Sequence, residues 1–386
     1  MAEQQKSIGF EELIAHFEEL EDPRSEINRK HPLVSVVVIS LMGILGGASG
    51  PTGIRMWAGT KQERLAALLP LPNGLPSRDV IRRVLCALKP DAFQQCFATW
   101  IASLSAAKVN SENRHIAIDG KTLRGSHDKA KGLGPLHLVS AWASEKGLTL
   151  GQVATDQKSN EITAIPELLR LIDLEGTVIT IDAMGTQKKI AEQIVTGKGD
   201  FILALKGNQE TMHQNVIDYV EQHVSNDFAD VVHQELVETE PKPKHGRTES
   251  RTYIQFEVPE TFAGRKQWKG LKTFGIVVYR RIEGGKEKID IRYYLSSLVL
   301  NILLFSKSVR SHWGIENTCH WSLDVTYGED GLRTRHRCAS ENEGWIRRFT
   351  LSLLKQHPLK TSLAMKRRKC GWSWDFLLEI LGVPTT

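Results

Sequence analysis

The 386-residue sequence has no long apolar run, no signal peptide pattern and few cysteines. Its most apolar stretch, residues 33–47, is shorter than the ~20 residues that a transmembrane helix needs, and glycines interrupt its end. We therefore expect a buried helix there. The polar residues 1–6 lack the apolar segment of a signal peptide. These absences favour a cytoplasmic protein without a membrane partner.

The five cysteines are scattered, and none belongs to a Cys-x-x-Cys pair. An odd number without that spacing is typical of reduced thiols and argues against a disulfide framework or a zinc ribbon. The thirteen histidines include no His-Glu-x-x-His pattern, so the common zinc hydrolase motif is also missing. The net charge of +5 permits a nucleic-acid partner without proving one.

Helical periodicity runs through the first part of the chain, up to about residue 108. The predicted helices cover residues 10–21, 33–47, 54–69, 79–88 and 93–104. Ser77 is a suitable N-cap for the fourth of them, which directs Arg78, Arg82 and Arg83 outward. This helix fits either a helix-turn-helix reader of DNA or a packing helix with a solvated basic face, and one sequence does not decide between them.

From residue 115 the pattern changes to three strands, a helix, a strand, a helix and a strand, which predicts one mixed sheet. The expected strands are 115–119, 136–143, 148–154, 177–182 and 201–205, and the expected helices are 162–172 and 187–195. Residues 207 to about 300 are polar and predict an inserted β-rich region with strands at 251–257, 273–279 and 291–296. A further helix is expected from about residue 307 to 323.

Two β-rich runs each end in an aspartate that is followed by small residues. Residues 116–118 precede Asp119, and residues 178–181 precede Asp182. A carboxylate at the end of a buried strand needs a compensating cation. If the two strands lie side by side, the carboxylates repel each other unless a divalent cation neutralises them. The alternative for Asp119 is a turn cap or an ion pair with Arg124.

The helix after the β-rich region carries a third acid. Trp313, Glu316 and His320 share one helical face, so we expect Glu316 to be at least partly buried. A salt bridge from Glu316 to Arg310 or His312 is the alternative. Three later acids, Asp324, Glu329 and Asp330, compete with Glu316 for the role of a third ligand.

Several long motifs occur in order along the chain. They include IAIDGKTLRGS, KSNEITAIPELL, VITIDAMGTQKKIAEQI, LALKGNQ, RYYLSSL and HWGIENTCHWSLDVTYGEDGLRTR, after an N-terminal block with EDPR, HPL and NGLPSRDVIRRVL. In these motifs the sequence resembles the H-repeat-associated branch of bacterial insertion-sequence transposases, which belong to the DDE superfamily. The resemblance covers nearly the whole chain, from about residue 10 to 355.

The resemblance implies an α+β protein with three parts. A helical N-terminal transposase-associated domain (1–108) precedes a ribonuclease H-like α/β catalytic core (109–360). A β-rich insertion at about 207–300 interrupts that core, and a basic C-terminal tail (361–386) follows it. In a ribonuclease H-like fold, acids lie on the first and fourth strands, where Asp119 and Asp182 are expected.

The resemblance also implies the chemistry. Carried over motif by motif, the catalytic and metal-binding triad is Asp119, Asp182 and Glu316. Oxygen ligands suit Mg²⁺, with Mn²⁺ as the other candidate, and two such ions can support phosphodiester cleavage. The expected function is that of a DNA transposase that cleaves and joins DNA at the ends of a mobile insertion sequence. The alternatives are a catalytically silent DNA-binding descendant and a metal-dependent DNA nuclease.

The expected partner is double-stranded DNA, at the element ends and at the target, bound by a homodimer associated with the bacterial nucleoid. The candidate DNA contacts are Lys121, Arg124, Lys206, Asn208, Gln209, His245, Arg247, His312, Trp313, Arg333 and Arg335. The alternatives are acidic partners for Lys121 and Arg124, a plain turn at 206–209, and core packing for Trp313. A protonated His312 is able to contact a phosphate. Further basic residues are expected on a backbone-binding surface: Arg347, Arg348 and residues 366–369.

Overall fold

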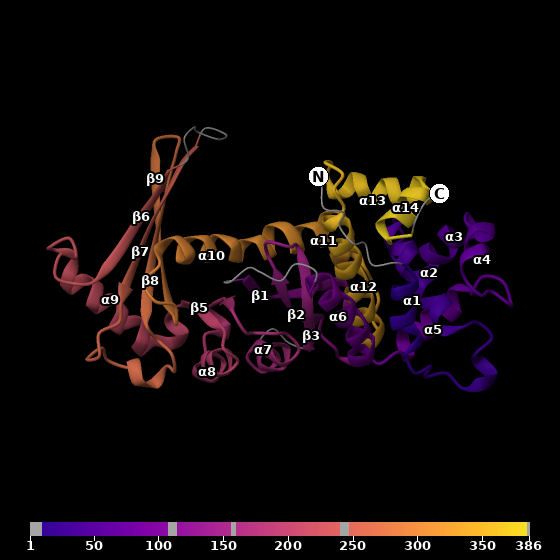
Figure 1. Cartoon of the computed structure of the whole chain (residues 1–386), viewed down its shortest axis with the longest axis horizontal. Helices are drawn as coiled ribbons and strands as arrows, with labels where there is room; N and C mark the ends of the chain where they lie inside the picture. Colours follow the sequence, from indigo (N-terminus) through magenta and orange to yellow (C-terminus); the bar gives the residue numbers. More distant parts are fainter. Residues whose placement is uncertain (1–9, 107–113, 156–159, 240–246, 384–386) are drawn as a thin grey trace.

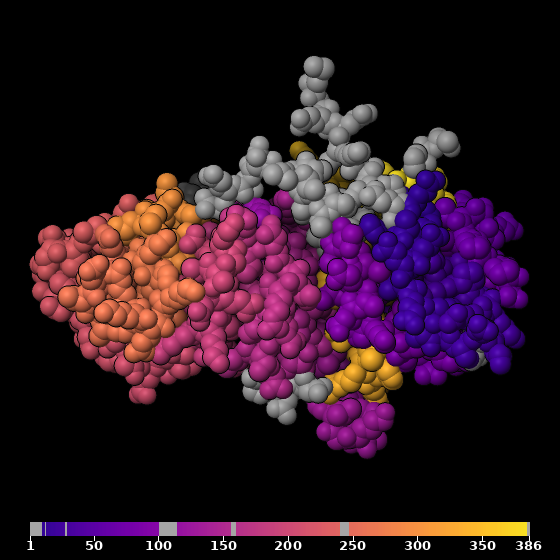
Figure 2. Space-filling view, turned by 60° about the horizontal axis from the view of Figure 1, so that its bottom comes forward, coloured from indigo at the N-terminus to yellow at the C-terminus, as the bar shows by residue number. Residues whose placement is uncertain are grey.

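The computed structural model describes residues 10–106, 114–155, 160–239 and 247–383. The molecule is elongated, with the N-terminal helices at one end, a sheet flanked by helices in the middle, and a strand-rich arm at the other end (Figure 1). Figure 2 shows the same order on the surface, where the indigo N-terminal helices and the orange strands lie on opposite sides of the magenta centre.

One mixed sheet of nine strands runs through the molecule in the order β3-β2-β1-β4-β5-β9-β8-β7-β6. The strands are β1 (Arg114–Leu123), β2 (Leu136–Ala143), β3 (Leu148–Thr155), β4 (Thr177–Ile181), β5 (Asp200–Leu205), β6 (His233–Thr239), β7 (Arg247–Glu257), β8 (Thr273–Glu283) and β9 (Lys286–Ser296). β4 runs parallel to β1 and β5, and the other pairs are antiparallel. The predicted mixed sheet is confirmed.

Alternating side chains of β1 and β4 bury both faces of the sheet, as parallel strands require. Ile116 and Ile179 face a core that they share with α7 (Glu161–Arg170) and α8 (Lys188–Thr196). Ala117 faces the other way and packs in a core with Ile315. Val178 lies on that second face as well, next to α10 (Ile302–Gly314). The sheet is therefore the middle of three layers.

The N-terminal part forms α1 (Phe10–Glu18), α2 (Leu33–Leu45), α3 (Pro51–Gly59), α4 (Gln62–Leu68), α5 (Arg78–Ala87) and α6 (Pro90–Ala106). α2 is almost wholly buried, as predicted, and none of the described helices has the length and apolarity of a membrane span. The predicted helix over 54–69 is instead two helices, because the Thr60 hydroxyl bonds to the Trp57 carbonyl where α3 ends. The Ser77 cap of α5 is confirmed.

The N-terminal helices and the end of the chain share one core around α12 (Arg337–Gln356). The rings of Phe97, Trp345 and Phe349 lie against one another there. The C-terminal segment adds α13 (Leu363–Trp372) and α14 (Trp374–Ile380). Arg367 is buried because its guanidinium donates to the carbonyls of Ile44 and Ala48 at the end of α2.

Lys366 is buried beside it and donates to the carbonyls of Leu354 and His357. The prediction that residues 366–369 form one exposed basic surface is therefore wrong for Lys366 and Arg367, because backbone carbonyls of packed helices capture both charges. Arg368 and Lys369 remain exposed.

The β-rich region extends the central sheet, because β9 pairs with β5. β7, β8 and β9 are longer than predicted and project as an arm beyond the body (Figure 1). Gly284 and Gly285 turn the last hairpin with positive φ angles. The region also contains α9 (Glu210–Val224), which the sequence did not predict because its apolar face is narrow, with only Met212 and Val216 buried.

The predicted helix over 307–323 is confirmed but is longer and irregular. α10 leads into a π-helical turn, Ile315–His320, and then into α11 (Trp321–Val325). This composite helix crosses the face of β1 and β4 (Figure 1).

Candidate active site

The register of β1 and β4 brings Asp119 and Asp182 next to each other. Ile118 pairs with Ile181 on these parallel neighbours, so each aspartate comes directly after a residue of this last pair. Alternation places both on the face that lies under α10. The predicted side-by-side arrangement of the two strands is confirmed. β1 nevertheless continues past Asp119 to Leu123, because residues 119–123 still pair with β2.

Asp119 is largely buried and lies in a region of negative charge. Its Oδ1 accepts a hydrogen bond of 2.8 Å from the amide of Gly120. Burial, the largest cause, and the neighbouring carboxylates of Asp182, Glu316 and Glu161 together raise the pKa of Asp119 to about 7, although this hydrogen bond lowers it. The alternative of an ion pair with Arg124 is wrong, because that guanidinium pairs with Asp330.

Asp182 begins a tight turn at the end of β4. Its Oδ1 accepts hydrogen bonds from the amides of Met184 and Gly185, at 3.1 and 3.3 Å. From the segment after β5, Asn208 donates to the carbonyl of Ala183 and Gln209 donates to that of Thr186. Asn208 and Gln209 thus brace the turn that holds Asp182, while Lys206 beside them is exposed.

Glu316 lies in the π-helical turn and is exposed. The expectation of partial burial is wrong, because this turn directs Ile315 and Cys319 into the core instead. Single π-turns within α-helices are frequent at functional sites. In the same turn His320 is mostly buried, with its Nδ1 3.6 Å from Asp119 Oδ2, and burial lowers its pKa to about 3.

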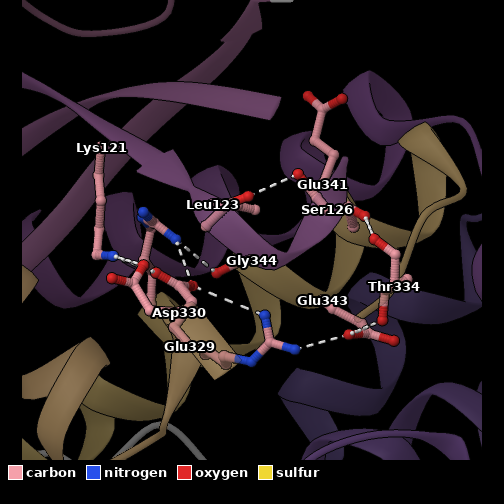
Figure 3. Close-up of polar contacts among 12 residues, drawn as sticks. Lys121, Leu123, Ser126, Glu329, Asp330, Thr334, Glu341, Glu343 and Gly344 are labelled. Atoms are coloured by element: carbon pink, nitrogen blue, oxygen red, sulfur yellow. Dashed lines mark hydrogen bonds and ion pairs between the residues drawn. The ribbon is translucent and has the colours of Figure 1, made fainter. Parts of the chain in front are cut away.

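The three competing acids are engaged by Lys121. Its Nζ lies 2.6 Å from Asp324 Oδ1, 3.1 Å from Asp330 Oδ1 and 3.6 Å from Glu329 Oε2. Figure 3 shows the lysine directed at Asp330 inside this group. Only 7% of the Lys121 side chain is exposed, so its prediction as a DNA contact is wrong. The continuation of β1 places Lys121 on the sheet face that also carries Asp119. Of the four acids, Glu316 is the one without an ion pair to a described residue.

Two predicted surface arginines are also buried. Arg347 pairs with Glu343 at 2.6 Å, and Arg348 pairs with Glu329 at 3.2 Å. Their placement on a backbone-binding surface is therefore wrong, because both belong to a buried ion network with Glu343 of the same helix and Glu329 of the preceding segment. Figure 3 shows these two glutamates. Exposed cations remain nearby at Arg124, Arg333 and Arg335.

The remaining candidates lie on α10 and the arm. His312 Nδ1 is 2.8 Å from the Thr180 hydroxyl, and burial lowers the pKa of His312 to about 4, so a protonated contact to phosphate is not favoured near neutral pH. The ring of Trp313 contacts the guanidinium groups of Arg292 and Arg310. It lies outside the apolar clusters of the described chain. A further candidate, Arg247, pairs with an acid on its own strand, and His245 lies outside the described residues.

A buried contact between a histidine and a glutamate, next to Gly120, was not predicted. His137 Nε2 and Glu161 Oε1 are 2.5 Å apart, and both side chains are buried. A Cβ at Gly120 would overlap both groups, so this position requires glycine. The sequence signals were the glycine directly after Asp119 and the acid at the start of an otherwise apolar-faced helix, α7.

The donors suit a hard divalent cation. Asp119, Asp182 and Glu316 offer only oxygen atoms, which Mg²⁺ and Mn²⁺ prefer. Part of the rise in the pKa of Asp119 comes from the neighbouring carboxylates, and a cation would relieve that repulsion. Within the described ranges, no three acidic, histidine or cysteine side chains already stand in ligating positions.

A mixed sheet with two aspartates on neighbouring parallel strands, faced by a helix with a glutamate, defines a candidate metal-dependent phosphoryl-transfer enzyme. Family models match residues 14–101 to the DDE_Tnp_1-associated family and residues 110–354 to the transposase DDE domain. The chain therefore belongs to the DDE transposase family. It is a DNA transposase, of a family that generally uses divalent metal ions.

Individual relatives agree. The H repeat-associated putative transposase YhhI of Escherichia coli is 34% identical over 380 residues, which cover 97% of this chain and 98% of the relative. The putative transposase YncI of Escherichia coli O157:H7 is 35% identical over 379 residues, covering 97% and 95%. A solved piggyBac transposase synaptic complex with hairpin DNA aligns with 100% of this chain and 80% of its own, at a TM-score of 0.38 and 11% identity, a likeness too low to establish a shared fold.

Proposed function

We propose that this transposase cleaves and joins DNA at the ends of an insertion sequence, with Asp119, Asp182 and Glu316 as its carboxylate triad. The observation that carries the proposal is the parallel register of β1 and β4, which brings the two aspartates together under the helix with Glu316. The strand order β3-β2-β1-β4-β5, antiparallel and then parallel, supports a ribonuclease H-like core.

The triad would hold Mg²⁺ or Mn²⁺, which when bound stabilises charge on the attacking and departing oxygens of the phosphodiester. The chain's own residues prepare this site. The amides of Met184 and Gly185 orient Asp182, and the amide of Gly120 orients Asp119. The engagement of Asp324 by Lys121 supports Glu316 as the third ligand.

We assign DNA backbone contacts to the exposed cations near the triad. Arg124 is 81% exposed and shares Asp330 with the buried Lys121, so it lies at the border between the ion network and solvent. Arg333 and Arg335 are exposed on the segment that follows. Long, exposed arginine side chains suit phosphate contacts. We assign a backbone contact to Lys206 as well, which follows the Asp182 turn along the chain.

Recognition of the element ends is assigned to the helical domain, residues 1–108, through α5. Ser77 caps this helix, and Arg78, Arg82 and Arg83 are exposed on it. The catalytic domain spans 109–360 in this proposal, and the family boundaries at 101 and 110 support the division. An insertion sequence has two ends that must be joined to the target, so we propose that the transposase binds DNA as a homodimer.

A cleavage assay on DNA with the flanking inverted repeats tests this function. We expect Mg²⁺-dependent nicks at the ends, followed by joining to a target plasmid. Asp119→Asn and Asp182→Asn should each abolish cleavage and keep end binding, because loss of transition-state charge stabilisation costs several kcal/mol. Cuts without joining would favour a nuclease, and end binding without cuts would favour a silent descendant. A variant that cleaves within about twofold of wild type would remove its residue from the triad.

A further inference from the structure

The helix with Glu316 is fastened to the sheet just before the π-helical turn. His312 Nδ1 is 2.8 Å from the Thr180 hydroxyl, which is 2.9 Å from His115 Nε2. His115 Nδ1 is 3.1 Å from the Ser144 hydroxyl, which donates to the carbonyl of Ser311. This upstream clamp joins β1, β4 and the β2–β3 turn to α10, and its centre is Thr180.

The same helix is fastened again just after the turn. Lys121 on β1 contacts Asp324 on α11, and it also contacts Glu329 and Asp330 in the next segment (Figure 3). This downstream clamp reaches the sheet face that also carries Asp119. The two clamps have no residue in common.

Glu316 lies between the clamps, in a π-helical turn whose geometry is rare and poorly stabilised by itself. A helix that is anchored on both sides of such a turn is held against sliding or rotating over the sheet, so the backbone of Glu316 keeps one position relative to Asp119 and Asp182. We propose that the two clamps position Glu316, and that Thr180 and Lys121 are positioning residues of the transposase. This inference rests on the proposed role of Glu316.

Thr180 is the sharpest place to test the upstream clamp. Its hydroxyl has one proton to donate and lone pairs to accept, so it serves both imidazoles at once. Valine has nearly the same shape and removes both bonds. β4 offers a matched control in Thr177, which is equally buried but donates to the nearby carbonyl of Leu174. Thr180→Ser keeps the hydroxyl and is the conservative rescue.

The experiment compares Thr180→Val, Thr177→Val, Thr180→Ser and Glu316→Gln in the full-length protein. It measures single-turnover cleavage at saturating DNA, the Kd for end DNA, Mn²⁺ binding by electron paramagnetic resonance, and Tm. Loss of a residue that orients a metal ligand typically costs about 10–100-fold in metal affinity or activity. We expect that loss for Thr180→Val in both Mn²⁺ binding and cleavage, with DNA affinity unchanged, and near-wild-type values for Thr177→Val and Thr180→Ser.

One outcome would refute the positioning role of the clamps and leave the triad in place. In it, Thr180→Val binds Mn²⁺ and cleaves DNA as well as Thr177→Val does, while Glu316→Gln is inactive. Wild-type cleavage by Glu316→Gln would instead overturn the triad, and the clamps with it. If Thr180→Val does not fold, the charge-balanced variant Lys121→Met with Asp324→Asn tests the downstream clamp with the same expectation. Unchanged cleavage and Mn²⁺ binding in that protein would refute the proposal.

Discussion

Replacement of Lys121 by methionine should destabilise the protein without removing a contact to DNA phosphates. Methionine keeps the apolar stem and removes the charge that three carboxylates share. Loss of one partner from a buried ion pair typically costs ~3–5 kcal/mol. The Asp324 and Asp330 side chains are 38% and 30% exposed, so water would solvate part of their negative charge once the lysine is gone. Glu329 is buried but keeps its arginine partners.

We therefore expect a loss of about 2–3 kcal/mol in the free energy of unfolding, somewhat below that range. Urea denaturation measures this quantity, because the shift of the midpoint at constant slope is a change in stability. The logarithm of the DNA affinity should keep its slope against the logarithm of salt concentration, since Lys121 neutralises protein acids and not phosphates.

Arg124→Gln is the matched control, since this exposed arginine lies three residues further along the same segment. Its stability should change by less than about 0.5 kcal/mol, as is usual on a surface, while the salt slope should fall by about one, the value for a lost phosphate contact. The reasoning would be refuted by the opposite result, in which Lys121→Met lowers the salt slope by about one and unfolds at the wild-type urea concentration.

Three other changes have clear expected outcomes. Glu316→Gln should abolish cleavage, whereas Asp324→Asn should stay active in the same assay, because Lys121 keeps Glu329 and Asp330 as partners; the reverse order would move the third ligand along the helix. Arg82→Ala with Arg83→Ala should narrow the ratio of end-DNA to scrambled-DNA affinity by ~1–3 kcal/mol per lost base contact, and an equal loss on both DNAs would identify α5 as a phosphate clamp. Burial raises the pKa of Glu341 from 4.5 to about 7, so the unfolded chain releases this proton first and stability falls as pH rises through that interval. Glu341→Gln should remove this fall and be more stable at pH 8 by on the order of 2 kcal/mol, as urea titrations at pH 5 and pH 8 would show.

Patterns of short range were predicted well. The spacing of apolar residues located most of the helices and strands, and the apolar stretch at 33–47 is the buried helix α2. The two β-rich runs that end in Asp119 and Asp182 are neighbouring parallel strands. Each prediction depends on a period of 2 or 3.6 residues that the backbone imposes locally, so neighbours along the chain carry the information.

The surroundings of charged residues were decided by the tertiary structure. Lys121, Arg348 and Arg367 belong to basic stretches that suggest a DNA surface, yet acids or carbonyls from distant segments capture them. The exposure of Glu316 likewise follows from a π-helical turn that no local pattern announced.

The sequence by itself determined the family, the order of the elements and the strands that carry Asp119 and Asp182, because motifs and periodicity are written along the chain. Only the tertiary structure decided which cations face solvent. A charge can be buried wherever opposite charges or carbonyl groups compensate its lost hydration. For Lys121 those partners lie about two hundred residues away in the sequence, so no local pattern could have revealed them.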